Sequence, residues 1–164
     1  MLTQEELKEI LDYYPETGIF RWKSNRANNK IKVVDIAGTL NYNGYRYIRM
    51  NGENYREHRL AWFYVYGHWP EKEIDHINGM KTDNSIENLR EASRSENNMN
   101  KPKQINNTSG YKGVCWHKAA QKWQAHIKIN KKLKHLGLFD SPEEAYAAYC
   151  EAAKRLHGEF ANLN

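Results

Sequence analysis

The stretch EIDHINGMKTDNSIENLREASRSENNMN, residues 73–100, places an aspartate beside a histidine and then repeats asparagine. A carboxylate together with neutral amide oxygens makes a hard oxygen site, which suits Mg²⁺ or Mn²⁺ and suits zinc poorly. Such an ion keeps several waters and takes the rest of its shell from a phosphate. The adjacent histidine, with an ordinary pKa of about 6.5, suits removal of a proton from water near neutral pH. These residue types indicate metal-assisted hydrolysis of a phosphate ester.

Histidine alone would not be sufficient for this chemistry. General-base catalysis contributes about 10²- to 10⁴-fold, or roughly 3–5 kcal/mol of barrier. Phosphodiester cleavage needs far more, and a metal ion supplies the missing stabilisation of charge at phosphorus and on the departing oxygen. A polar turn is the alternative for Asp75 and His76 taken alone, because Asp-His before Asn-Gly is common in hairpins. The asparagines and the helix cap that follow in order favour the catalytic interpretation.

A hairpin followed by a helix must position these residues. Ile74 to Ile77 reads as the end of a strand that enters an Asn-Gly turn, and residues 84–90 read as the returning strand. Ser93, with Glu three positions later, forms a capping box that opens a helix. This order of strand, loop, strand and helix predicts that Asp75 and Asn97 come together, although they are distant along the chain.

Upstream of this stretch the sequence predicts small structural elements and carries no chemical motif. Residues 3–14 read as a capped helix, residues 19–23 and 45–50 as strands, and residues 58–67 as a short buried helix. We expect residues 1–57 to be an α/β extension of the first half. Four basic residues of this extension could add nucleic-acid contacts: Arg21, Lys23, Arg46 and Arg49.

Charge divides the chain into two parts. The formal net charge is +5, yet residues 1–100 hold 14 Lys and Arg against 15 Asp and Glu, whereas residues 101–164 hold 11 against 5. From Lys101 to Lys134 there are nine lysines and no acid, which favours a polyanion as partner. Residues 101–110, KPKQINNTSG, read as a linker, and we place the domain boundary there.

Beyond the linker the sequence predicts three strands and a helix. Residues 122–130 alternate between apolar and polar side chains, as in a half-buried strand. Residues 111–116 and 133–139 are the flanking strands, and Ser141 caps a helix that Gly158 ends. The small alanines of this helix would let it lie close to the sheet. The expected fold class is therefore α+β.

Composition excludes several classes of protein. Cys115 and Cys150 stand far apart and form no metal or disulfide framework, which favours a reducing compartment. No stretch approaches the roughly 18 apolar residues of a membrane span, and the first residues do not resemble an export signal. We therefore expect no membrane partner and a cytoplasmic location, in a bacterium or a phage-infected host cell.

The motifs HRLAW, IDHINGMKTDNSIENLREAS and SENN, in this order over residues 58–100, resemble the HNH endonuclease family. The likeness is to the phage and intron-associated nicking homing endonucleases with a β-β-α-metal fold. It implies that Asp75 and Asn97 bind one Mg²⁺ or Mn²⁺ ion per active site. It further implies that His76 activates water and that Asn88 pins the hairpin loop.

Three assignments stay open at this point. Asn98 is an alternative to Asn97, because the two adjoin on one helix, and Asn84 is an alternative to Asn88. His58 is equally compatible with a phosphate contact and with a buried, hydrogen-bonded histidine.

The motifs YKGV, KWQAHI, LGLF and EEAYAAY, within residues 107–164, resemble the Apetala-type DNA-binding domain of plant ethylene-response factors. The resemblance implies a sheet that lies in the major groove of DNA. Cys115 also falls on the outward face, and Trp116 fits either packing or DNA contact. This chain is poorer in arginine, so we expect mainly phosphate contacts with modest base reading. The expected DNA-binding residues are Lys112, His117, Gln124, His126, Lys128, Lys131, Lys132 and His135.

Together these patterns predict a metal-dependent endonuclease that acts on double-stranded DNA as a monomer or weak dimer. The predicted domains are residues 1–57, the nuclease core 58–100, the linker 101–110 and the DNA-binding domain 111–164. The alternative is a DNA-binding protein or regulator with an inactive nuclease fold.

Overall fold

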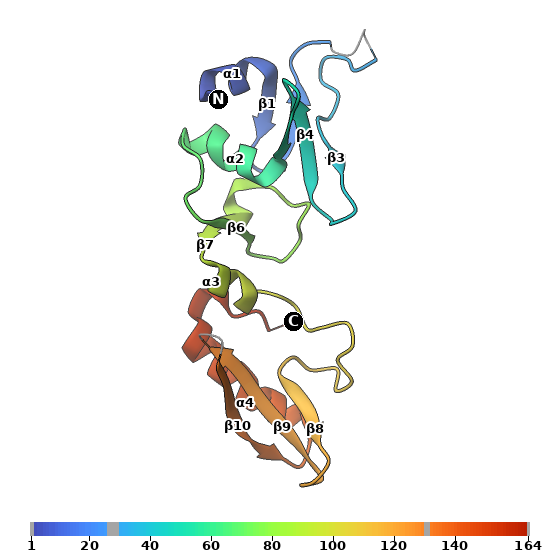
Figure 1. The fold of residues 1–164 in the computed structure, drawn as a ribbon, viewed down its shortest axis with the longest axis vertical. Helices are drawn as coiled ribbons and strands as arrows, with labels where there is room; N and C mark the ends of the chain where they lie inside the picture. Colours follow the sequence, from blue (N-terminus) through green and yellow to red (C-terminus); the bar gives the residue numbers. More distant parts are fainter. Residues whose placement is uncertain (1, 26–29, 130–131, 164) are drawn as a thin grey trace. The chain divides into compact units, whose positions relative to one another are not determined.

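The computed structural model describes residues 2–25, 30–129 and 132–163, and the chain divides into two compact units, Met1–Ala92 and Ser93–Asn164 (Figure 1). Each unit mixes helices and strands, which confirms the expected α+β class. We expected the boundary in residues 101–110, whereas the division by packing falls after Ala92.

The first unit opens with a short helix and a hairpin. Helix α1 (Gln4–Ile10) begins with the predicted capping box of Thr3 and Glu6. The helix predicted over residues 3–14 was too long, because Leu11–Tyr14 forms strand β1 and pairs antiparallel with β2 (Ile19–Trp22). Alternate residues of β1 are buried, and that period of two suits a strand rather than a helix.

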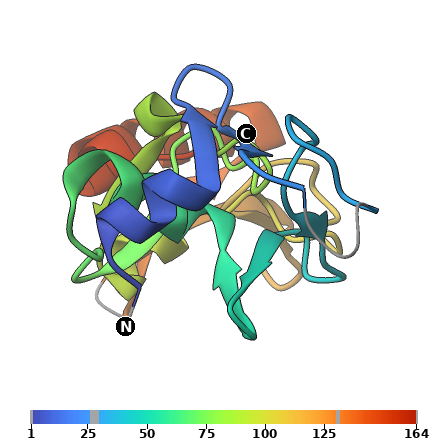
Figure 2. The same cartoon turned by 90° about the horizontal axis from the view of Figure 1, so that it is seen from above.

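A three-stranded sheet and a second helix complete the core of this unit. Strands β3 (Thr39–Leu40), β4 (Arg46–Met50) and β5 (Glu53–Arg56) pair in that order and lead into α2 (Glu57–Tyr66). Helices α1 and α2 lie side by side in both views (Figure 1, Figure 2). The largest fully buried side chains of this core are Leu7, Leu11, Phe20, Ile48, Met50 and Leu60.

The hairpin predicted around Asp75 is present. Strand β6 (Glu73–His76) pairs antiparallel with β7 (Leu89–Ala92), which places Asp75 opposite Arg90. The returning strand was expected at residues 84–90, but a short 3-10 turn, η1 (Ile86–Asn88), precedes it. The strand therefore begins five residues later than expected, and residues 84–88 form part of the loop.

The second unit contains α3 and the predicted sheet and helix. Ser93 and Glu96 form a capping box at the start of α3 (Arg94–Met99), as predicted. Strands β8 (Val114–His117), β9 (Lys122–Ile129) and β10 (Lys132–Phe139) form a sheet in the order β10-β9-β8. Helix α4 (Pro142–His157) packs on this sheet and is followed by η2 (Gly158–Phe160). The buried residues between sheet and helix are Val114, Ala125, Ile127, Ala145, Tyr149, Ala152 and Ala153.

In the part of the chain that the structure describes, no helix is long and apolar enough to cross a membrane.

Candidate active site and nucleic-acid interface

His76 ends strand β6 and is held by an asparagine of the loop that follows. The ring is only 4% exposed, and its Nε2 lies 3.1 Å from Oδ1 of Asn84, which is itself 1% exposed. Because an amide oxygen can only accept, Nε2 carries the hydrogen and Nδ1 is the basic nitrogen of a neutral ring. Burial lowers the pKa of His76, although the bond to Asn84 opposes that shift. The sequence suggested Asn84 only as an alternative to Asn88.

The β1–β2 hairpin contacts the backbone of Asn84 and of the residues that follow it. The hydroxyl of Tyr13 donates a buried hydrogen bond of 2.7 Å to the Asn84 carbonyl oxygen. The amide of Ile86 donates to the carbonyl of Pro15 at 3.0 Å. Gly18 adopts φ +69°, and a Cβ added there would lie 2.2 Å from the carbonyl carbon of Asn84. Residues with no chemical motif of their own therefore fix the partner of His76.

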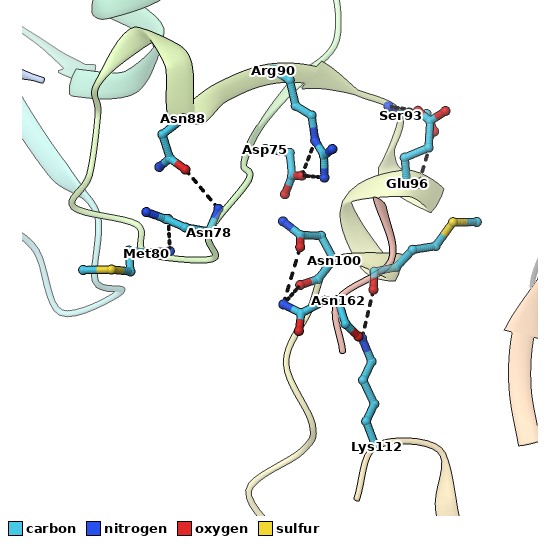
Figure 3. Close-up of polar contacts among 11 residues, drawn as sticks. Asp75, Asn78, Met80, Asn88, Arg90, Ser93, Glu96, Asn100, Lys112 and Asn162 are labelled. Carbon is cyan, nitrogen blue, oxygen red and sulfur yellow. Dashed lines mark hydrogen bonds and ion pairs between the residues drawn. The ribbon is translucent and has the colours of Figure 1, made fainter. Parts of the chain in front are cut away.

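Asn88 closes the loop between the two strands. Its Oδ1 accepts from the amide of Asn78 at 2.9 Å (Figure 3). Its Nδ2 donates to the carbonyl of Asp83 at 2.8 Å. Asn78 in turn accepts from the amide of Met80 at 2.8 Å. This geometry favours Asn88 over Asn84 as the residue that pins the loop.

Asp75 is buried and paired with an arginine that the sequence analysis overlooked. Its side chain is 5% exposed, and its Oδ2 accepts from Nε of Arg90 at 3.0 Å and from Nη2 at 2.9 Å (Figure 3). The strand register alone would have identified Arg90, because it is the cross-strand neighbour of Asp75.

The donors expected to hold a metal fit a hard cation. Asp75 offers carboxylate oxygen and Asn97 offers amide oxygen, both of the type that Mg²⁺ prefers. Asp75 belongs to the first unit and Asn97 to the second, on α3, so their pairing stays a proposal. Among the described residues no group of three or more His, Cys, Asp and Glu is placed to hold an ion. Two protein oxygens would therefore leave the remaining positions to water and phosphate.

His58 and Arg46 have structural roles. The His58 ring is 3% exposed and lies 5.2 Å from the His76 ring at 86°. Burial, followed by the nearby His76, lowers the pKa of His58 to about 3, so the ring is neutral at physiological pH. These features favour the buried histidine over the phosphate contact. Nε of Arg46 donates to Glu57, which is 1% exposed, at 2.7 Å, so we withdraw Arg46 from the expected DNA contacts.

The outward face of the second unit's sheet is rich in histidine. Residues directly opposite one another in an antiparallel pair share a face. Cys115 is opposite Gln124, and His126 is opposite His135. Nδ1 of His135 lies 2.9 Å from Nε2 of Gln124. The alternate residues Ala125 and Ile127 are buried against α4, as the alternation predicted.

The position of two expected DNA contacts differs from the prediction. Lys132 is opposite Ile129, and Ile129 packs against the core that includes α4. Because residues directly opposite one another share a face, Lys132 lies on the helix-facing side of the sheet. Nζ of Lys112 donates to the carbonyls of Met99 at 2.9 Å and Asn162 at 3.1 Å (Figure 3). Burial lowers the pKa of this amine to about 8. We therefore remove Lys112 and Lys132 from the proposed DNA-binding set.

Three further residues of the second unit were expected to contact DNA or to pack in the sheet. Lys131, expected to bind DNA, lies outside the described residues. His117 shares the outward face because it is opposite Lys122. Trp116 is opposite Trp123 and packs against its ring at 5.2 Å, which favours packing over DNA contact.

Comparison with known proteins agrees with this arrangement. Residues 55–99 match the family model described as HNH endonuclease, and residues 109–159 match that of the AP2 domain. Protein 3.8 of Escherichia phage T7 is 33% identical over 109 residues, which cover 66% of this chain and 89% of the relative. The chain belongs to the same family as Protein 3.8. No solved structure matches it.

The HNH and AP2 domains confirm the two resemblances stated from the motifs, in the predicted order. The HNH match includes α3, which packing assigns to the second unit together with the AP2 domain. The chain therefore joins a nuclease-type domain to a DNA-binding domain.

Proposed function

We propose that this chain is a divalent-metal-dependent DNA endonuclease that nicks one strand of a duplex. The arrangement of His76 supports this proposal most directly: a neutral imidazole, oriented by Asn84, directly follows Asp75 on strand β6 within the HNH match. The AP2 domain would hold the duplex through the outward face of its sheet. One site per chain cuts one strand, so a double-strand break would need a second chain or a second binding event.

In the proposed reaction His76 removes a proton from water through Nδ1. Asn84 keeps the other ring hydrogen on Nε2 and stabilises the imidazolium that forms, because its oxygen continues to accept that hydrogen. Asn88 keeps the loop closed, so Asn84 and His76 hold their relative positions. The expected products carry a 5′-phosphate and a 3′-hydroxyl.

The metal would be held by Asp75 and Asn97. When bound, Mg²⁺ or Mn²⁺ stabilises the negative charge that develops on the phosphate and on the leaving oxygen. Arg90 holds the Asp75 carboxylate in place through its two contacts with Oδ2.

A plasmid assay tests the proposal. Supercoiled DNA incubated with the full chain should be converted to open circles in the presence of Mg²⁺ or Mn²⁺ and should remain supercoiled in EDTA. Nicking that is equally fast in EDTA would contradict the metal requirement.

The second candidate is a DNA-binding protein with an inactive HNH domain. The low exposure of His76 and Asp75, 4% and 5%, favours it, because water and a metal must reach both side chains. This candidate predicts normal DNA binding and no open circles with either ion.

Asn84 should act on the chemical step through His76. Asn84→Ala removes the acceptor of the Nε2 hydrogen, and we expect kcat to fall on the order of 10- to 100-fold while KM is unchanged. Asn84→Asp should restore much of the rate, because a carboxylate oxygen still accepts that hydrogen. In the described part of the chain Nδ2 of Asn84 has no partner, so replacing it with oxygen removes no bond. Equal losses in both variants would contradict the orienting role.

DNA affinity should increase at acid pH. His126 faces His135, Gln124 and Cys115, and burial, followed by the charge of His135, lowers the pKa of His126 below its usual 6.5. A phosphate favours the charged ring, so affinity rises as pH falls below about 6.5. The gain is up to about tenfold if DNA raises the pKa by about one unit. Titrations at pH 7.5 and 5.5 should show this gain, and His126→Gln should reduce it, unlike the control His68→Gln.

A further inference from the structure

Two exposed cations lie against one aromatic ring in the first unit. Nζ of Lys81 is 4.8 Å from the centroid of the Tyr45 ring, and the guanidinium carbon of Arg56 is 5.7 Å from it. The same ring lies 5.2 Å from the His58 ring and 6.0 Å from the His76 ring. The Tyr45 ring therefore contacts both cations and also lies near His76, the proposed base.

Hydrogen bonds hold both cations in place. Nε of Arg56 donates to the hydroxyl of Tyr47 at 3.2 Å, and Nζ of Lys81 donates to the carbonyl of Asn43 at 3.0 Å. The acceptors are uncharged, so neither bond neutralises a cation. Tyr45 and Asn43 lie in the turn between β3 and β4, Tyr47 lies in β4, Arg56 ends β5, and Lys81 lies in the loop between β6 and β7. The fold therefore brings together residues that are distant in the sequence.

Neighbouring arginines are used differently. Arg46 pairs with Glu57, Arg90 pairs with Asp75, and Arg59 donates to the backbone carbonyls of Pro70 and Lys72. Within the ranges that the structure describes, Arg56 and Lys81 form no ion pair with a carboxylate. The positive charges of Arg56 and Lys81 repel each other when held near one ring. An anion bound between them would be attracted to both and would offset that repulsion.

We propose that Arg56, Lys81 and Tyr45 form a binding site for a backbone phosphate of the DNA that the HNH domain cuts. This inference rests on the proposed function, because the phosphate would lie near His76, the proposed base, only if the HNH domain cuts DNA. Burial lowers the pKa of His58, next to Tyr45, to about 3, so this ring adds no positive charge there and Arg56 and Lys81 supply it. Arginine and lysine on an aromatic support suit an oxyanion, and the aromatic ring limits their freedom before DNA arrives.

The site replaces part of the interface expected from the sequence. Arg21 donates to the Val34 carbonyl, Lys23 pairs with Asp12 at 3.7 Å, and Arg46 is engaged as described above. Arg56 and Lys81 differ from them because both lie over Tyr45, whose ring is 6.0 Å from that of His76, the proposed base.

Equilibrium binding of the full chain to a DNA duplex, measured in EDTA over a range of salt, tests the site without any cleavage. Each phosphate contact contributes about 0.9 to the slope of log affinity against log salt. Because the site holds one phosphate, the double variant Arg56→Gln/Lys81→Gln should reduce the steepness of that slope by about 0.9, and Lys81→Gln alone should reduce it by a smaller amount. Lys81 is an exposed loop residue, so its single variant should fold normally.

A matched control removes the same charge from the same unit. Lys8 also lies over a tyrosine ring, 5.3 Å from the centroid of Tyr64, and Lys72 is exposed. Lys8→Gln/Lys72→Gln should leave the slope close to that of the native chain. Equal slopes for both double variants would overturn the site. A native chain that binds DNA with the predicted slopes but never nicks it would overturn the proposed function and leave the phosphate site standing.

Discussion

His76→Ala should lower the Mg²⁺-dependent nicking rate by about 10²- to 10⁴-fold, the usual contribution of a general base. The alanine removes the nitrogen that accepts the proton and the hydrogen bond between His76 and Asn84. The rate is measured from the conversion of supercoiled to open-circular plasmid under single-turnover conditions, so product release does not limit it.

DNA affinity separates loss of chemistry from loss of binding. The His76→Ala variant should bind duplex DNA within about twofold of the native chain, since a buried neutral ring contributes no charge to the interface. His68→Ala, at an exposed histidine of the same unit, should nick at the native rate. Nicking by His76→Ala at the native rate would refute the assignment of the base.

Gly18→Ala should destabilise the first unit by at least about 3 kcal/mol. The new Cβ would lie 2.2 Å from the carbonyl carbon of Asn84 and 2.3 Å from the amide nitrogen of Ser85, which is far inside contact distance. The backbone must separate there, and the hydrogen bond from Tyr13 to Asn84 would be lost with it. Urea unfolding measures the change in free energy, and nicking below the unfolding transition measures displacement of His76.

Gly52 provides the matched comparison. It also has a positive φ, +84°, but a Cβ there would meet nothing within 4 Å. Gly52→Ala therefore carries only the conformational cost of a left-handed alanine, about 1 kcal/mol, and should keep full activity. If the two variants lose the same free energy of unfolding, the close approach of Gly18 to Asn84 is not the reason that position 18 requires glycine.

The architecture of the second unit was predictable because its signals are local. Strict alternation from Trp123 to Ile129 fixed a strand, and Ser141 with Pro142 fixed the start of the helix. The first helix was predicted too long because Leu11 and Tyr13 fit either a helical or a strand period in so short a segment. Their pairing with β2, a tertiary contact, decides in favour of the strand.

The candidate site was predictable only where a motif carried it. The positions of Asp75, His76 and Asn88 follow from a contiguous pattern, whereas Asn84 gains its role from a bond that depends on the path of the loop. Tyr13 gave no signal, since an aromatic residue in a short apolar segment is usually core. The face occupied by Lys132 depends on the pairing register between β9 and β10, which composition does not determine.

The contact between Tyr13 and Asn84 limits how this HNH domain could be moved to another protein. A cassette cut at residue 55, where the HNH match begins, would contain the entire motif but leave behind the hydroxyl and the glycine that support Asn84. A portable unit must start upstream of α1. Chimaeric proteins joined at residue 55 should therefore bind duplex DNA without cleaving it.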